Sequence, residues 1–88
     1  MQERTVTIKN KLGLHARPAA LLVQSAAKFK SRIKIWKDDQ EVDGKSIMGL
    51  MTLAASSGSN LRIVIEGPDE NEAIEALSNL INSGFGEE

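Results

Sequence analysis

Cysteine is absent from the 88-residue sequence, which excludes disulfide bonds, thiolate metal sites and thiol-based catalysis. Only one histidine occurs, so a histidine-rich metal cluster is excluded as well. No apolar run approaches the roughly 20 residues of a membrane-spanning helix, and the charged start MQERTVTIKN lacks the apolar region of a secretory signal. We therefore expect a cytoplasmic protein without membrane contact, bound metal or other cofactor.

An excess of positive charge is also lacking, because 11 Lys and Arg residues face 12 Asp and Glu residues for a net charge of -1. Such a chain has no overall basic field for a nucleic-acid backbone, which excludes nucleic acid as a partner. The sequence has no Walker-type glycine loop, and its scattered carboxylates exclude a metal-dependent hydrolase. At this length one modest core is possible, so residues 1–88 are predicted to form a single domain.

The hydrophobic periodicity predicts seven elements. Alternation predicts strands over residues 5–9, 32–37, 41–42 and 61–66, and helical spacing predicts helices over residues 16–27, 47–53 and about 69–83. Each strand shows only one apolar face, so we expect an α+β fold with the helices on the apolar face of a mostly antiparallel, open-faced sheet. Asp69 and Glu72 resemble a capping box at the start of the last helix, and Gly84 is expected to end that helix.

The single histidine lies in the stretch GLHARPAA, where the first helix is about to begin. Gly13 allows a tight turn and Pro18 suits the first helical turn, so His15 is expected at or just before the helix N-terminus. The helix begins either at Ala16 or, because residues before proline disfavour helical geometry, at Pro18 with Arg17 as the flanking residue. In both registers the free N–H groups disfavour an imidazolium and favour an anion.

Arg17 adds a planar guanidinium group that suits phosphate oxygens. Two plainer interpretations stay open: His15 has a surface or capping role, or Arg17 pairs with a surface carboxylate for less than about 1 kcal/mol. The favoured hypothesis is that His15 accepts a phosphoryl group that Arg17 stabilises. Because no second catalytic group accompanies them, the pattern predicts a carrier rather than an enzyme.

Ser46 precedes a short apolar helix and is predicted to be its N-cap. A phosphorylated serine at this position would carry about two negative charges where the helix dipole tolerates them, so modification could change a binding surface without unfolding the domain. The helix holds more apolar residues than one stripe can bury. Ile47, Met48 and Met51 are therefore expected either to form an exposed docking surface or to pack in the core.

Four features together resemble the HPr phosphocarrier proteins of the bacterial phosphoenolpyruvate-dependent phosphotransferase system: GLHARPAA, KSIMGLM at the matching distance, the EGPDENEA run and the overall length. The resemblance spans nearly the whole chain. It implies a four-stranded antiparallel sheet in the order 1-4-2-3 with three helices on one face. It also implies that His15 is phosphorylated on Nδ1 by enzyme I, with Arg17 stabilising the phosphate, and that the group passes to enzyme IIA domains for carbohydrate uptake.

The same resemblance implies that an ATP-dependent HPr kinase/phosphorylase modifies Ser46 for regulation, with a transcriptional regulator as a further partner. It implies a docking surface near Ala20, Leu21, Ile47, Met48 and Met51, and we expect the protein to be a monomer. The tail INSGFGEE and the start TVTIKNKLGLHARP also resemble the nitrogen-related branch called NPr, so both branches stay open. A regulatory binding module, switched through Ser46 and with transfer by His15 secondary, is the remaining alternative.

Overall fold

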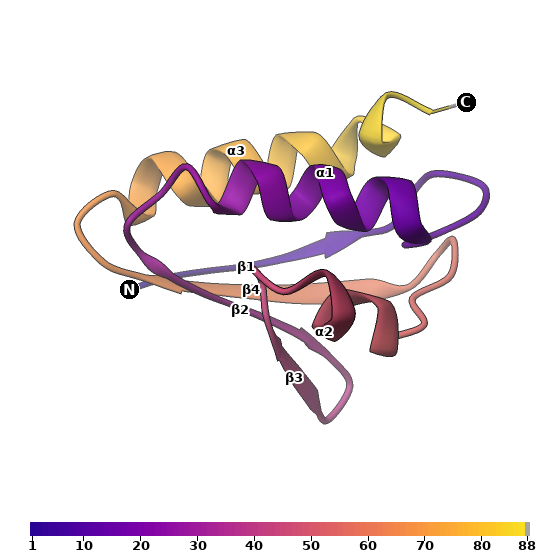
Figure 1. The fold of residues 1–88 in the computed structure, drawn as a ribbon, viewed down its shortest axis with the longest axis horizontal. Helices are drawn as coiled ribbons and strands as arrows, with labels where there is room; N and C mark the ends of the chain where they lie inside the picture. The colour runs from indigo at the N-terminus through magenta and orange to yellow at the C-terminus, as the bar shows by residue number, and fades with distance from the viewer. Residues whose placement is uncertain (88) are drawn as a thin grey trace.

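The structure is a computed structural model, and it describes residues 1–87. Figure 1 shows its elements, which are β1 (Gln2–Thr7), α1 (Ala16–Ala26), β2 (Arg32–Lys37), β3 (Gln40–Asp43), α2 (Ile47–Thr52), β4 (Asn60–Glu66), α3 (Glu70–Asn82) and the 3-10 turn η1 (Gly84–Gly86). The predicted order of four strands and three helices is confirmed. The turn η1 is an addition that the hydrophobic pattern did not predict.

The four strands form one antiparallel sheet in the order β1-β4-β2-β3, as expected. The register aligns apolar residues across the central strands, for example Ile35 of β2 between Ile63 of β4 and Val42 of β3. Directly opposed residues point to the same face of a sheet, so this register places the apolar set on a single face. The predicted α+β open-faced fold is therefore confirmed.

The core lies between that apolar face and the helices. Leu61, Ile63 and Ile65 of β4 are fully buried, and so are Leu22 of α1 and Leu77 of α3. Burying each such side chain stabilises the fold by about 1.5–3 kcal/mol relative to exposure. Figure 1 shows α1 and α3 side by side over the sheet. Because α1 is held in this layer, the loops at its two ends have fixed positions relative to the strands.

The helix boundaries answer one question that the sequence left open. The helix α1 begins at Ala16, so Pro18 is its third residue and lies in the first turn, where its missing N–H costs no hydrogen bond. At the other end of the chain α3 ends at Asn82, and Gly84 follows with φ +68, which confirms it as the terminator. Within residues 1–87 no helix combines the length and apolar character that crossing a membrane requires.

The predicted capping box at the start of α3 is wrong. Asp69 is the N-cap residue, but its side chain makes no capping hydrogen bond and so forms no pair with Glu72. Its carboxylate instead accepts hydrogen bonds from the backbone N–H groups of Lys30 (2.8 Å) and Ser31 (3.0 Å) and from the Ser31 hydroxyl (2.5 Å). Three donors from the loop between α1 and β2 outcompete the helix N–H groups, since the sheet brings that loop beside the start of α3.

Candidate functional site

His15 is the N-cap residue of α1, in an extended conformation with φ -82 and ψ -172. Its backbone carbonyl accepts the first helical hydrogen bond, from the N–H of Ala19 at 3.0 Å, but its ring makes no capping hydrogen bond. The imidazole is therefore available for other contacts. The N–H groups of Ala16 and Arg17 occupy the first two helical positions, where no acceptor exists within a helix, so two donors remain at this helix end.

The loop before His15 is anchored against the segment that follows α2. Gly13 has φ +72, and a Cβ atom there would lie 2.5 Å from the carbonyl oxygen of Ala55, so both the conformation and the close approach require glycine. Leu14 is buried and donates its N–H to the same carbonyl at 2.8 Å. These contacts fix the backbone from which the histidine ring projects.

The C-terminal tail returns to the end of the molecule where α1 begins (Figure 1). Phe85 of η1 is buried, with 3% of its surface exposed, and anchors the tail there. The carboxylate of Glu87 then lies beside the imidazole, with Nε2 of His15 at 3.3 Å from Oε1 and 3.2 Å from Oε2. The amide Nδ2 of buried Asn10 donates to Oε1 at 2.9 Å, and Nη1 of Arg17 is 3.8 Å from Oε2.

The site is a depression of about 640 Å³ that is open to solvent and is lined by Lys11, Leu12, His15, Arg17, Gly86 and Glu87. Burial alone raises the pKa of the Glu87 carboxyl. Hydrogen bonds from Asn10 and His15, with the charges of His15 and Arg17, lower it by more than burial raises it, so the pKa lies below its ordinary value. A carboxylate only accepts hydrogen bonds, so this contact favours the imidazole tautomer with its hydrogen on Nε2. Nδ1 then carries the free lone pair, and no partner for it is found within residues 1–87.

The structure thus brings His15 and Arg17 together and adds two residues that sequence reasoning missed, Glu87 and Asn10. The side chain of Arg17 is 70% exposed and only loosely contacts Glu87, so the structure also shows the carboxylate pairing that was the plainer interpretation. One signal in the sequence could have located the tail: Phe85 is a large apolar residue beyond the end of the last helix, and such a residue needs a place in the core.

Ser46 is the N-cap of α2, and its hydroxyl accepts a hydrogen bond from the N–H of Gly49 at 3.0 Å, which confirms the capping prediction. Ile47, Met48 and Met51 are exposed at 45%, 77% and 41%. They do not pack in the core, which takes Leu50 and Leu53 instead, while Ala20 and Leu21 of α1 are half-buried. Their use in docking stays a prediction.

The geometry places an imidazole with an unpartnered Nδ1 at a helix N-terminus within residues 1–87. Comparisons with known proteins identify the family of the chain. The family model described as "PTS HPr component phosphorylation site" matches residues 2–83. The chain belongs to the HPr family. The phosphocarrier protein HPr of Treponema pallidum is 49% identical over 88 residues that cover all of both chains. The HPr-like protein Crh of Halalkalibacterium halodurans is 57% identical over 77 residues, which cover 88% of this chain and 92% of that protein.

A solved structure agrees with the sequence comparisons. The crystal structure of HPr-C-His from Thermoanaerobacter tengcongensis matches with a TM-score of 0.96 and 58% identity, covering 100% of this chain and 99% of that one. The chain is accordingly an HPr phosphocarrier of the phosphotransferase system, and it is not an enzyme. The resemblance first suggested by GLHARPAA and KSIMGLM is confirmed at the level of the family.

Proposed function

We propose that, in the cytoplasm, Nδ1 of His15 accepts a phosphoryl group from phosphorylated enzyme I, which takes the group from phosphoenolpyruvate. Enzyme IIA domains then receive the phosphoryl group from His15 for use in carbohydrate uptake. The observation that supports this most is the contact between Glu87 and Nε2 of His15, because it leaves Nδ1 as the nucleophilic nitrogen. In this proposal the 88 residues act as a single HPr domain and as a monomer.

The transfer needs little beyond positioning. The Nδ1 lone pair attacks phosphorus, the bond from phosphorus to the donor group of enzyme I breaks, and its electron pair leaves with that donor group. The hydrogen on Nε2 stays in place and faces Glu87, which offsets the positive charge that develops on the ring. The free N–H groups at the start of α1 and the guanidinium of Arg17 face the arriving oxygens.

Glu87 also makes the group easy to pass on. A phosphoryl group on the ring places negative charge near the Glu87 carboxylate, and like charges at such distances repel. Arg17 contacts Glu87 only at 3.8 Å and its side chain is largely exposed, so it is free to move to the phosphate. A phosphocarrier has to bind the phosphoryl group and then release it. The Glu87 carboxylate beside the imidazole limits how tightly the phosphoryl group is held.

The partners are proposed to dock on the exposed side chains of α2, together with the half-buried Ala20 and Leu21 of α1. Ile47, Met48 and Met51 form an apolar surface next to Ser46. Flexible methionines adapt to several partners, as required of a surface that meets enzyme I and enzyme IIA domains in turn. A phosphate on Ser46, added by an HPr kinase/phosphorylase, would place about two negative charges beside this surface and change its choice of partner.

Incubation with purified enzyme I and phosphoenolpyruvate tests the proposal. We expect one acid-labile phosphate per chain in the wild type, none in His15→Ala, and onward transfer to an added enzyme IIA domain. Lys9→Gln removes a charge outside the site and serves as the control, with unchanged labelling. Labelling that persists in His15→Ala, or that never reaches a IIA domain, contradicts the proposal.

One comparison favours a second candidate function. The 57% identity to an HPr-like protein Crh is as high as that to HPr proteins, so a binding module switched by Ser46 is the alternative. An NPr-type carrier with regulatory partners also stays open, on the resemblance of the tail INSGFGEE and the start TVTIKNKLGLHARP to that branch. Ser46→Asp and His15→Ala separate these functions. If Ser46→Asp recruits a transcriptional regulator while His15→Ala leaves sugar uptake unchanged, the regulatory module is the main function. A carrier predicts the loss of uptake with His15→Ala.

A further inference from the structure

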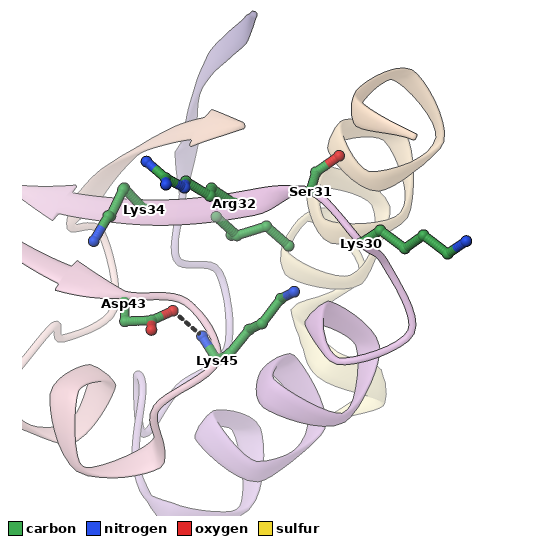
Figure 2. Close-up of a pocket in the computed structure, with 7 residues that line it drawn as sticks. Lys30, Ser31, Arg32, Lys34, Asp43 and Lys45 are labelled. Atoms are coloured by element: carbon green, nitrogen blue, oxygen red, sulfur yellow. Dashed lines mark hydrogen bonds between the residues drawn. The ribbon is translucent and has the colours of Figure 1, made fainter. Parts of the chain in front are cut away.

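A basic depression lies at the opposite end of α1 from His15. The helix has 11 residues and therefore spans about 16 Å. Beyond its C-terminal end, the loop leading to β2, the first residues of β2 and the segment after β3 enclose about 340 Å³ (Figure 2). The lining residues are Lys30, Ser31, Arg32, Ile33, Lys34, Asp43 and Lys45. Neither the carrier site nor the α2 docking surface uses any of them.

The depression carries an excess of positive charge. Four cationic side chains line it against the single carboxylate of Asp43. Within residues 1–87, none of the four forms an ion pair, although Arg4, Arg17 and Arg62 each do so elsewhere on the protein. In a chain with a net charge of -1, four cations against one lining carboxylate are a local excess of positive charge, which favours the binding of an anion.

The two nearby carboxylates accept hydrogen bonds from backbone N–H groups. Asp43 accepts the N–H of Lys45 at 2.9 Å, and Asp69 accepts the N–H groups of Lys30 and Ser31. These bonds hold both walls of the depression in place. A ligand would therefore meet a backbone that needs no rearrangement, which lowers the entropic cost of binding.

Gly44 completes the rigid wall. A Cβ atom at this position would lie 2.5 Å from Cγ2 of Ile33, and the Gly44 N–H donates to the Ile33 carbonyl at 2.8 Å. The close approach brings Lys45 alongside β2. The Lys45 ammonium group donates to the Phe29 carbonyl at 2.8 Å, which uses one of its three donors and leaves two for a ligand.

Figure 2 shows how the cations are arranged. Arg32 and Lys34 come from β2, and Lys45 extends from the segment after β3 toward the loop that precedes β2. Lys30 extends away from the others and lies at the rim. The charged ends of Arg32 and Lys34 extend to one side of the depression and that of Lys45 to the other, so the cations are divided between two places. Arg32 supplies the planar group that binds phosphate oxygens in pairs.

We propose that this depression binds a small metabolite that carries two phosphate groups. Its volume is at the lower end of the range for small-molecule sites, which suits a compact ligand. A nucleic-acid strand would have to continue across the open face of the sheet. There the exposed carboxylate of Glu41, opposite Trp36, would repel its phosphates.

The test uses inorganic pyrophosphate as the probe and backbone amide NMR of the whole chain as the readout. We expect saturable chemical shift changes at Lys30, Arg32, Lys34 and Lys45, at constant ionic strength maintained with sodium chloride. Inorganic phosphate is expected to shift the same amides but to bind about tenfold more weakly, since it engages fewer cations. Shifts at residues 11–17 report the separate anion site at His15 and are fitted independently.

Two variants make the test specific. Arg32→Gln should weaken pyrophosphate binding by about tenfold, and its exposed side chain can change without disturbing the core. Lys37→Gln removes the same charge from the same strand on the other face, and it should leave binding unchanged. The amide spectrum shows directly that each variant is folded.

Three results would overturn the proposal. One is a linear, non-saturating response shared by all surface lysines, which indicates general ionic attraction. Another is equal weakening by Arg32→Gln and Lys37→Gln. The third is a single-stranded oligonucleotide that competes with pyrophosphate and shifts amides across the whole open face of the sheet, which assigns the surface to nucleic acid.

Discussion

Among single residues, Glu87 has the most specific contact in the site. Its carboxylate accepts from Asn10 and lies about equally far from Nε2 of His15 with both oxygens. The contact comes from a residue 72 positions away in the chain, so it depends on the buried Phe85 that fixes the tail. One acidic side chain therefore orients the ring and favours one tautomer, and in the proposed function it also weakens the hold on a bound phosphate.

Glu87→Gln separates these effects because it keeps the shape and removes the charge. We expect phosphorylation of His15 by enzyme I to slow by about fivefold, since a neutral amide is a weaker partner for the ring N–H than a carboxylate. The phosphorylated form should then live longer, because the repulsion is gone. Rapid-quench labelling measures the first rate, and hydrolysis of the isolated phosphoprotein measures the second. Equal rates in both proteins would show that the contact has no role in transfer.

Ser46 allows a similar separation of stability from charge. Ser46→Ala removes the hydrogen bond to the N–H of Gly49 and should lower the free energy of unfolding by about 1 kcal/mol. Ser46→Asp should retain most of that stability, because aspartate is also a good N-cap. Urea unfolding measures both. If Ser46→Asp proves as unstable as Ser46→Ala, altered partner binding by that variant could not be attributed to charge alone.

At the scale of elements, Asp69 joins the start of α3 to the loop between α1 and β2. Hydrogen bonds from the Ser31 hydroxyl and the Lys30 N–H lower the pKa of its carboxyl. A lowered pKa in the folded state means that the charged form stabilises the fold. This contribution is complete above the ordinary pKa of about 3.9 and is lost as the pH falls through the lowered value.

Asp69→Asn should therefore unfold at a lower urea concentration than the wild type at neutral pH. The difference should stay constant down to about pH 5 and shrink at lower pH, when the wild-type carboxyl becomes protonated. Glu72→Ala is the control, since the structure gives that side chain no part in a capping box. A difference between wild type and Asp69→Asn that grows as the pH falls would have the wrong sign for this mechanism.

The order of the elements and the faces of the strands could be predicted because they follow from local periodicity, as with Leu61, Ile63 and Ile65 of β4. The position of His15 followed from Gly13 and Pro18 in the same short segment. Asp69 and Glu87 could not be predicted, because their partners lie 38 and 72 positions away. Contacts of that kind depend on which loops the sheet order brings together.

For the whole molecule, stability resides in the layer between the sheet and the helices. Ile63→Ala in the central strand β4 should cost about 2–5 kcal/mol, because its side chain is fully buried and leaves a cavity. Val64→Ala, on the open face of the same strand, should cost clearly less. Urea unfolding of both variants measures the difference. Equal losses would mean that the open face is covered in solution.

The central claim is that Glu87 on Nε2 makes Nδ1 the phosphoryl acceptor, and the position of the phosphate on the ring tests it most directly. We would label the histidine ring with 15N, phosphorylate the protein with enzyme I and phosphoenolpyruvate, and record the ring nitrogens by NMR. The account predicts phosphorus on Nδ1 of His15 with the hydrogen retained on Nε2. Phosphorus on Nε2 would contradict it.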